Sequence, residues 1–152
     1  MPTALFTDVA KDQESGLVRN RVESLRIGAQ PLIATTTYTA INTEAAADTI
    51  EICRLPAGAQ LLVSRWKVST DGVGGTGAAV ASIGTTGAAS AYSSTSIAIV
   101  SAGDNAVTAT NAEAVTNTVL AAETPILATL ALSSGAFTAG KKVTFRIEYL
   151  IP

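Results

Sequence analysis

The chain has 152 residues, a formal net charge of −2 and no histidine, and only 14% of its residues are charged. So weak a net charge does not attract nucleic acid or an anionic membrane, and no run of about 20 apolar residues is present to span a bilayer. A catalytic site usually gathers several ionisable groups, and few are available here. We therefore expect a structural or binding protein rather than an enzyme, without a metal ion or cofactor.

Charged residues are concentrated at the N-terminus. Residues 1–30 hold eight of them, whereas the remaining 122 residues hold fourteen. We expect an N-terminal arm over 1–30, either extended or a short amphipathic helix, followed by one domain over 31–152. The arm is interpreted as a segment that docks on a neighbouring molecule, and a solvated, partly disordered leader is the simpler alternative. Because the first residues lack the pattern of a signal peptide and Cys53 has no partner for an internal disulfide, folding in a reducing cytoplasm is expected.

From Pro31 on, apolar residues recur every second position, as in a β-strand. Clear alternation predicts strands at 31–41, 48–55, 61–70 and 141–150. Weaker patterns predict further strands at 78–83, 96–100, 105–110, 115–120 and 126–132. Residues 111–123 fit a short helix capped by Asn111 equally well, and the glycine- and serine-rich segments 71–77 and 84–95 are typical of loops. Eight or so short strands predict an all-β fold, most often a jelly-roll-like or Greek-key β-sandwich, with a barrel as the alternative.

Two glycine-rich segments approach phosphate-binding motifs without the context that those motifs need. Residues 72–77 match G-x-G-x-x-G, but no helix pattern follows them and no acidic residue stands about 20 positions further on. Residues 135–142 approach the P-loop pattern, but Lys142 occupies the position that requires Ser or Thr to hold magnesium. The first segment is therefore expected to be a flexible hairpin loop, and the second is expected to open the strand that begins at Lys141.

Three further features of the sequence resemble reactive sites, but only weakly. Ser64 and Lys67 have the S-x-x-K spacing of an acylating pair, but on a strand these positions point to opposite faces. Cys53 is expected to be a small buried apolar residue, since no histidine is present to activate it. An enzyme would need two carboxylates to converge, for example Glu51 and Glu148, which spacing alone cannot show.

Two possible binding features also remain weak. Asp71 and Asp104 are expected in glycine-containing loops where calcium could bind, but two carboxylates more than 30 residues apart are a poor signal. Trp66 together with Tyr38 or Tyr92 could form a platform for stacking a sugar. Because Trp66 lies on the apolar side of its predicted strand, we expect it in the core instead.

Several features follow one another in a characteristic order, most clearly over residues 55–84. An Ala/Thr-rich first strand precedes the turn Leu55-Pro56-Ala57-Gly58, and the next strand ends in a glycine-rich loop. A short strand then closes on Gly84, and an alternating strand from Val143 to Ile151 follows an Ala-Gly turn at 139–140. In these features the chain resembles the small decoration or cement proteins of tailed-bacteriophage virions, which are often encoded near the major capsid gene. The resemblance covers about residues 31–152 and leaves out the first 30.

The resemblance implies a jelly-roll-like β-sandwich that forms homotrimers, binds the major capsid protein on the outer surface of the shell and reinforces it. It carries over no catalytic residue. The candidates for contact with the capsid are charged residues of the N-terminal arm: Arg19, Arg21, Glu23 and Arg26. The alternative is a head-fibre or tail-associated module that binds carbohydrate on the host surface. Such a module would expose aromatic side chains on a loop, and Tyr92 is the candidate.

Overall fold

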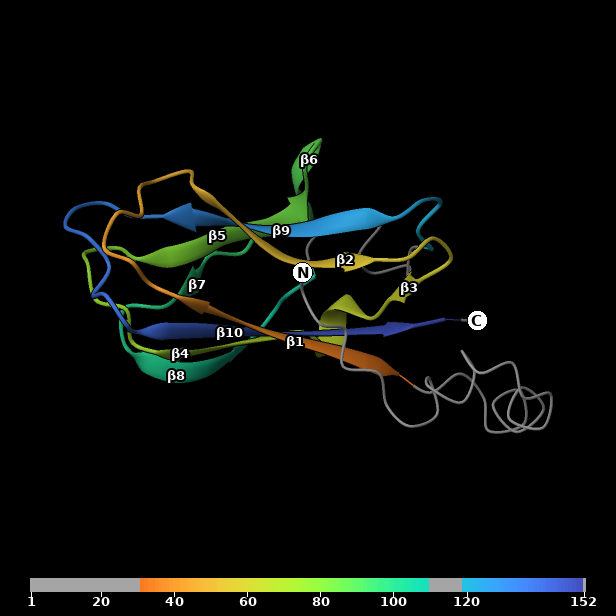
Figure 1. The fold of residues 1–152 in the computed structure, drawn as a ribbon, viewed down its shortest axis with the longest axis horizontal. Helices are drawn as coiled ribbons and strands as arrows, with labels where there is room; N and C mark the ends of the chain where they lie inside the picture. Colours follow the sequence, from red (N-terminus) through yellow and green to blue (C-terminus); the bar gives the residue numbers. More distant parts are fainter. Residues whose placement is uncertain (1–30, 110–118, 152) are drawn as a thin grey trace.

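A computed structural model describes residues 31–109 and 119–151, which form two antiparallel sheets packed face to face (Figure 1). Sheet 1 contains, in spatial order, β1 (Leu32–Thr39), β10 (Lys142–Leu150), β4 (Lys67–Asp71) and β8 (Ala102–Ala106), and the short β3 (Gln60–Leu61) also pairs with β10. Sheet 2 contains β2 (Thr49–Leu55), β9 (Thr124–Ala131), β5 (Ala79–Thr85) and β6 (Ala88–Ser93), and the short β7 (Ile97–Ala98) also pairs with β5. The predicted arm at 1–30 lies outside the described residues.

The strand order is that of a jelly roll. The chain passes from β1 in sheet 1 to β2 in sheet 2, returns to β4, crosses to β5–β7, and then alternates through β8, β9 and β10. The first and last strands therefore become neighbours, with Leu32 opposite Tyr149 and Thr39 opposite Lys142. The second strand and the second-last strand, β2 and β9, pair in the same way in the other sheet. Such nested antiparallel pairings confirm the predicted all-β, jelly-roll-like sandwich.

Apolar residues at every second position of a strand lie on the same face and form the core between the two sheets. In β10, Val143, Phe145 and Ile147 are buried, as the alternation predicts. Trp66 is 0% exposed, and its ring meets that of Tyr92 edge-on with centroids 5.6 Å apart. At roughly 25 cal/mol per Å² of apolar surface, full burial of a side chain such as Phe or Ile stabilises the fold by about 1.5–3 kcal/mol.

The predicted strand 61–70 is interrupted by a short 3₁₀ helix, η1 (Val63–Arg65). The Arg65 N–H donates to the Leu62 carbonyl at 2.9 Å, and the Trp66 N–H donates to the Val63 carbonyl at 3.0 Å. The turn brings Val63 and Trp66, three positions apart, into the same core, where both are almost completely buried. A continuous strand would point these two side chains to opposite faces. Burial of two large side chains therefore overrides the strand pattern.

The predicted loop at 84–95 is wrong, because β5 extends through Gly84 and residues 88–93 form β6. The hairpin depends on the absence of a side chain at Gly84, where an added Cβ would lie 2.1 Å from the Ala88 carbonyl oxygen. The predicted strand at 105–110 is displaced, since β8 covers Ala102–Ala106. The choice between helix and strand at 111–123, and most of the predicted strand at 115–120, fall on residues 110–118, outside the described part.

Candidate functional site

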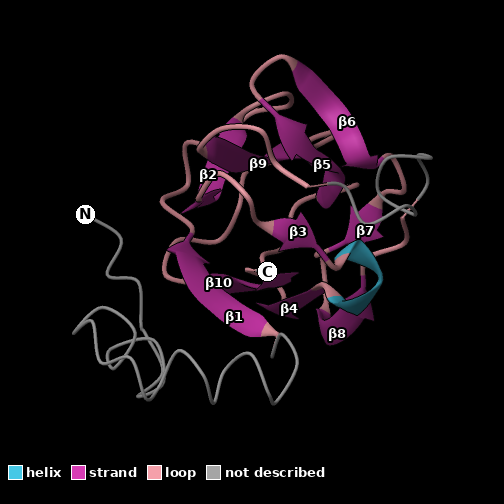
Figure 2. Ribbon diagram, turned by 90° about the vertical axis from the view of Figure 1, so that its right-hand side faces the viewer, coloured by secondary structure: helices cyan, strands magenta, loops and turns pink. Residues whose placement is uncertain are grey.

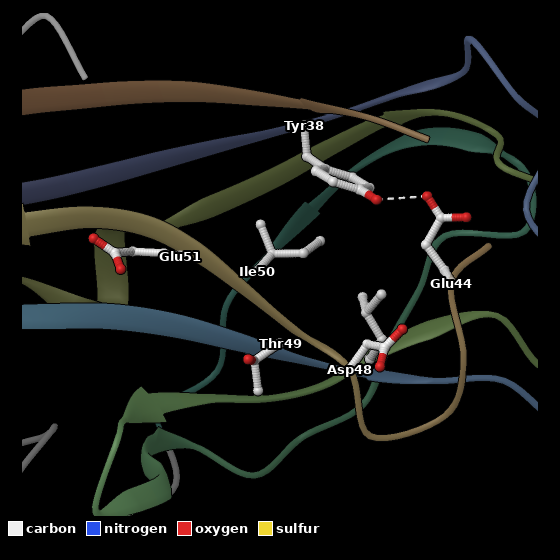
Figure 3. Close-up of a pocket in the computed structure, with 7 residues that line it drawn as sticks. Tyr38, Glu44, Asp48, Thr49, Ile50 and Glu51 are labelled. Carbon is white, nitrogen blue, oxygen red and sulfur yellow. Dashed lines mark hydrogen bonds between the residues drawn. The ribbon is translucent and has the colours of Figure 1, made fainter. Parts of the chain in front are cut away.

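An open pocket with a volume of about 500 Å³ lies beside the end of β1 and the start of β2 (Figure 3). Its lining residues are Tyr38, Glu44, Asp48, Thr49, Ile50, Glu51 and Leu130. Two of its acidic residues come from the connection between β1 and β2, which bends at two positive-φ residues, Asn42 and Ala47. Whether the pocket could bind or react with a ligand therefore depends on whether its carboxylates already accept hydrogen bonds from the protein.

Glu44 is the most enclosed of these carboxylates, at 8% exposure. It accepts hydrogen bonds from the Tyr38 hydroxyl at 2.5 Å, from the Ile41 N–H at 2.7 Å and from the Thr43 N–H at 3.1 Å. Burial alone would raise the pKa of Glu44, but these hydrogen bonds outweigh it and hold the pKa below its usual value. Burial, together with the bond to Glu44, raises the pKa of Tyr38 to about 12.

The other two carboxylates of the pocket also have local partners. Asp48 accepts a hydrogen bond from the Ala45 N–H at 2.7 Å, and Glu51 pairs with Arg54 at 2.7 Å. A general base must be free to take a proton from a bound substrate. All three acidic side chains are instead hydrogen-bonded to or ion-paired with other groups of the protein, so we assign them structural roles.

The structure keeps apart the carboxylates that an enzyme would have needed to converge. Glu51 lies on β2 in sheet 2, whereas Glu148 lies on β10 in sheet 1 and pairs with Arg146 at 2.9 Å. The expectation that Cys53 is buried is confirmed, since it is 8% exposed and desolvation raises its pKa to about 12. Ser64 lies within η1, which corrects the strand placement used for the S-x-x-K spacing.

The aromatic side chains proposed for sugar stacking point inward. The expected core position of Trp66 is confirmed, and its indole N–H donates to the Glu148 carbonyl at 2.9 Å. Tyr92 is 4% exposed and contacts Trp66. Tyr38 is half-buried with its hydroxyl on Glu44. Since a stacking platform requires an exposed ring face, Trp66 and Tyr92 do not form one here.

The loop placement expected for the two aspartates considered for calcium is wrong, because Asp71 lies on β4 and Asp104 on the neighbouring strand β8. The register places Ser69 opposite Asp104 and Asp71 opposite Ala102, so both carboxylates occupy the outer face of sheet 1. Among residues 31–109 and 119–151, no cluster of three or more His, Cys, Asp or Glu side chains could hold a metal ion. No helix in the same part of the chain is long and apolar enough to cross a membrane.

Both glycine-rich segments are loops, as predicted, but the hairpin predicted at 72–77 is wrong. Residues 72–77 connect β4 of sheet 1 to β5 of sheet 2, and all four of their glycines have positive φ. Residues 135–141 precede β10 and contain two more positive-φ glycines. The predicted capsid-contact residues lie outside the described part of the chain: Arg19, Arg21, Glu23 and Arg26.

The two outer faces of the sandwich differ in charge, which the sequence analysis missed. On sheet 1, alternating outward side chains of β4, β8 and β10 include six charged residues: Lys67, Asp71, Asp104, Lys142, Arg146 and Glu148. On sheet 2, the strands β5, β6, β7 and β9 contain no charged residue. The only charges on the described strands of sheet 2 are Glu51 and Arg54 on the edge strand β2, and they bind each other.

We call the uncharged surface of β5 and β9 the sheet 2 face. Its accessible residues are Pro125, Leu127, Thr129 and Ala131 of β9 and Ser82 of β5, whereas Ala79 and Gly84 of β5 are buried. The register places Thr129 opposite Ser82 and Leu127 opposite Gly84, which is covered by the backbone of Ala88 and Ala89. The alternation of 124–131 could have predicted an uncharged outward row, but not its neighbour in β5.

Comparison with solved structures relates this fold to phage capsids. No protein-family model matches the chain, and no curated protein matches its sequence. A chain in the capsid asymmetric unit of cyanophage Pam1 has a TM-score of 0.56 and 19% identity, covering 82% of this chain and 87% of that one. The fold is shared with chains of phage capsid structures.

Two further structures give the same result. A chain in the capsid of Ralstonia phage GP4 has a TM-score of 0.59 and 18% identity, with coverage of 82% and 85%. A chain in the acid-stable capsid of Helicobacter pylori bacteriophage KHP30 has a TM-score of 0.52 and 12% identity, with coverage of 82% and 94%. At these identities the likeness establishes a common fold, and function is a separate inference.

Proposed function

We propose that this protein is a structural component of a tailed-phage virion that binds the outer surface of the capsid as a homotrimer and stabilises the shell. The observation that carries the proposal is the fold match to chains of three phage capsid structures, each over 82% of this chain. The decoration-protein resemblance of residues 55–84 points to the same role. The major capsid protein is the proposed partner.

The local chemistry supports a role without catalysis. The carboxylates of the pocket bind protein groups, the thiol of Cys53 is buried, and Trp66 and Tyr92 lie in the core. A cement protein needs none of these groups to be reactive. It needs only to bind the assembled shell more tightly than the free subunits, because that difference in affinity shifts the equilibrium toward the shell.

In this proposal the N-terminal arm provides contacts to the capsid. Residues 1–30 combine acidic and basic side chains, which suit complementary contacts with a charged shell. Deleting residues 2–27 should leave the β-domain folded, because β1 begins at Leu32, and should abolish binding to capsids. A truncated chain that sediments with capsids as the full chain does would contradict the role of the arm.

The stabilising role is tested by heating particles with and without the protein and measuring the temperature of genome release. Even about 1–2 kcal/mol per bound copy, repeated over the shell, should raise that temperature. The arm-deleted chain is the matched control, since it should fold but should not bind. Equal release temperatures for bare particles and for particles shown to carry the protein would refute the cement role and favour the host-binding alternative.

The carbohydrate-binding alternative receives less support from the described residues. Its candidate aromatic side chain, Tyr92, contacts Trp66 in the core and is 4% exposed. Binding to host glycans in an array, with no effect on particle stability, is the result that would restore this alternative.

A further inference from the structure

β1 is an edge strand of sheet 1 without the features that usually protect an edge. Figure 2 shows it at one side of the sheet, beyond β10, β4 and β8, and on the same side of the sandwich as β2. Its eight residues, Leu32–Thr39, pair with β10 without a break in register and include no charge and no proline. The other edge strands of the described part are irregular or short: β2 has a register shift between Glu51 and Cys53, β6 pairs across another shift, and β8 has five residues with a charge at Asp104. A long, regular, uncharged edge such as β1 readily pairs with a further strand.

The backbone of β1 also has hydrogen-bonding groups that no described strand uses, since β1 pairs only with β10. The Ala40 N–H donates to the Lys141 carbonyl at 2.8 Å, and this pair continues the register of β1 with β10. Because hydrogen bonding alternates along an antiparallel strand, the even-numbered residues of β1 are the ones that bond to β10. The N–H and C=O groups of the odd-numbered residues therefore point to the open edge: Ile33, Thr35, Thr37 and Thr39.

The inward side chains of β1 are incompletely covered. They are only half-buried: Leu32, Ala34, Thr36 and Tyr38. The inward side chains of the neighbouring β10 are at most 1% exposed: Val143, Phe145 and Ile147. A strand beside β1 with apolar side chains on its inner face would remove more apolar surface from water, which stabilises the fold.

The pocket at the end of β1 lies at this same edge, and its lining is acidic without a basic side chain. Figure 3 shows Tyr38, Glu44 and Asp48 around it. In the described part of the chain, neither Glu44 nor Asp48 has a cation within salt-bridge distance. Asp48 is exposed, so its carboxylate can accept a further partner. The Tyr38 end of the edge therefore favours a cationic side chain.

The chain that leads into β1 has the sequence of a strand that could cover this edge. Residues 28–31, Gly-Ala-Gln-Pro, place two turn-forming residues directly before β1, and four residues are a common length for a hairpin loop. A turn over these residues puts Ile27 opposite Leu32 and Leu25 opposite Ala34. Paired residues share a face of the sheet, so both apolar side chains of the arm then point inward.

The same register matches the charges. It places Arg21 opposite Tyr38, beside the acidic pocket, and Glu23 opposite Thr36, one inward pair further from the pocket. The part of the arm nearest to β1, residues 17–27, holds three arginines and one glutamate, whereas residues 1–16 hold three acidic residues and one lysine. The basic half of the arm is thus the half that is joined to the acidic edge.

We propose that residues 20–27 fold back over the loop 28–31 and add an antiparallel strand to the β1 edge of their own copy, with Arg21 at the acidic pocket. The chain's own arm is the favoured occupant because it is joined to the start of β1, which keeps it at a high effective concentration beside the edge. The inference goes beyond the proposed function. It assigns Arg21 and Glu23 to the domain itself and leaves Arg26 and residues 1–19 for contact with the capsid.

Disulfide cross-linking in the full chain tests the register, with Cys53→Ala removing the native thiol. Val22→Cys together with Thr37→Cys should form an intramolecular disulfide under mild oxidation, since the register pairs these positions on the exposed face. Glu23→Cys together with Thr37→Cys is the matched control. Its two side chains would point to opposite faces, so its bridge should form at least about tenfold more slowly.

Three outcomes of the cross-linking would overturn the inference. The first is the absence of a bridge in the Val22→Cys pair, and the second is an equal rate for the two pairs. The third is a bridge that joins two chains, seen as a doubled mass in non-reducing electrophoresis at low protein concentration, because the arm would then cover the edge of a second copy. Circular dichroism must show that each variant is folded.

Hydrogen exchange of backbone amides tests the edge without any substitution. The amides of Ile33, Thr35 and Thr37 should exchange at least about tenfold more slowly than in an unstructured chain, because they would donate to the arm. The amides of Ala34 and Thr36 bond to β10 and serve as the internal control, since they stay protected whether or not the edge is covered. Free exchange of the three edge amides in the wild-type protein would refute the added strand.

Charge reversal tests the role assigned to Arg21. Arg21→Glu brings a carboxylate to the acidic pocket and should speed exchange of the edge amides by about tenfold, because an attraction becomes a repulsion. Arg26→Glu makes the same change on the opposite face of the strand and should leave their exchange unchanged. Equal exchange in the two variants would contradict the placement of Arg21.

Binding to capsid particles enters none of these measurements. An open β1 edge in protein that binds particles would refute this inference and leave the proposed function intact. A covered edge in protein that does not bind particles would refute only the proposed function.

Discussion

Replacing the carboxylate of Glu44 by an amide should destabilise the β1–β2 connection through a loss of hydrogen bonds with little change in shape. Glu44 accepts from the Tyr38 hydroxyl and from the N–H groups of Ile41 and Thr43. In Glu44→Gln, only one of the two side-chain atoms remains an acceptor. Whichever way the amide is turned, an N–H donor then faces a backbone N–H donor.

The size of the effect follows from these three bonds. A hydrogen bond to a charged group stabilises by about 1.5–3 kcal/mol and a neutral one by about 1 kcal/mol, so weakening two bonds and losing the third should cost about 3 kcal/mol. Tyr38→Phe removes a single bond and should cost about 1.5 kcal/mol. Because both variants remove the same Tyr38–Glu44 bond, their combined cost should be smaller than the sum.

The assay is urea unfolding followed by the fluorescence of Trp66, the single tryptophan, which is completely buried in the folded protein. Glu123→Gln is the control, because its side chain is 67% exposed and its nearest cation, Arg54, lies 3.9 Å away. That variant should change the free energy of unfolding by less than about 0.5 kcal/mol. A loss of the same small size in Glu44→Gln, or strict additivity with Tyr38→Phe, would refute the assignment of Glu44 as the group that holds the connection.

Three further predictions concern acid, the hairpin and the thiol. The pKa of Glu44 in the folded protein lies below its value of about 4.3 in the unfolded chain. The carboxylate therefore stabilises the fold above that pH, and this stabilisation is lost as the pH falls through the folded pKa. In urea titrations, the difference in the free energy of unfolding between wild type and Glu44→Gln should shrink below about pH 4. Gly84→Ala should lower the thermal midpoint, because the added Cβ meets the Ala88 carbonyl oxygen, whereas Gly87→Ala, with nothing within 4 Å, should not; equal midpoints would contradict the close approach. Cys53 should react with a thiol reagent at pH 8 only after unfolding, because burial raises its pKa to about 12, and rapid labelling of native protein would show that it is accessible.

Several features of the fold could be predicted from local sequence. The alternation in 141–150 placed Val143, Phe145 and Ile147 in the core, since successive side chains of any strand point to opposite faces. The turn at Pro56–Gly58 was predicted from its proline and glycine, and Gly58 has the positive φ that glycine adopts without strain. The burial of Cys53 and Trp66 followed from their place in apolar segments.

Other features depended on tertiary contacts. Residues 63–65 form a turn because Val63 and Trp66 must both enter the core, and the alternating pattern of 61–70 contains no sign of that constraint. β6 was missed because its Ala- and Ser-rich sequence has almost no hydrophobic signal, and its geometry depends on the close approach at Gly84.

The amino-acid sequence by itself determined that the chain would form short strands with small side chains and few ionisable groups, because these are local properties. Only the tertiary structure decided which carboxylates accept hydrogen bonds from the protein and on which face of the sandwich the charged side chains lie. Glu44 meets Tyr38 through the bend of one connection, and Leu127 meets Gly84 through the pairing of β9 with β5. An uncharged face arises when strands from distant parts of the sequence become neighbours, and the order of strands in a sheet is set by the packing of the whole domain.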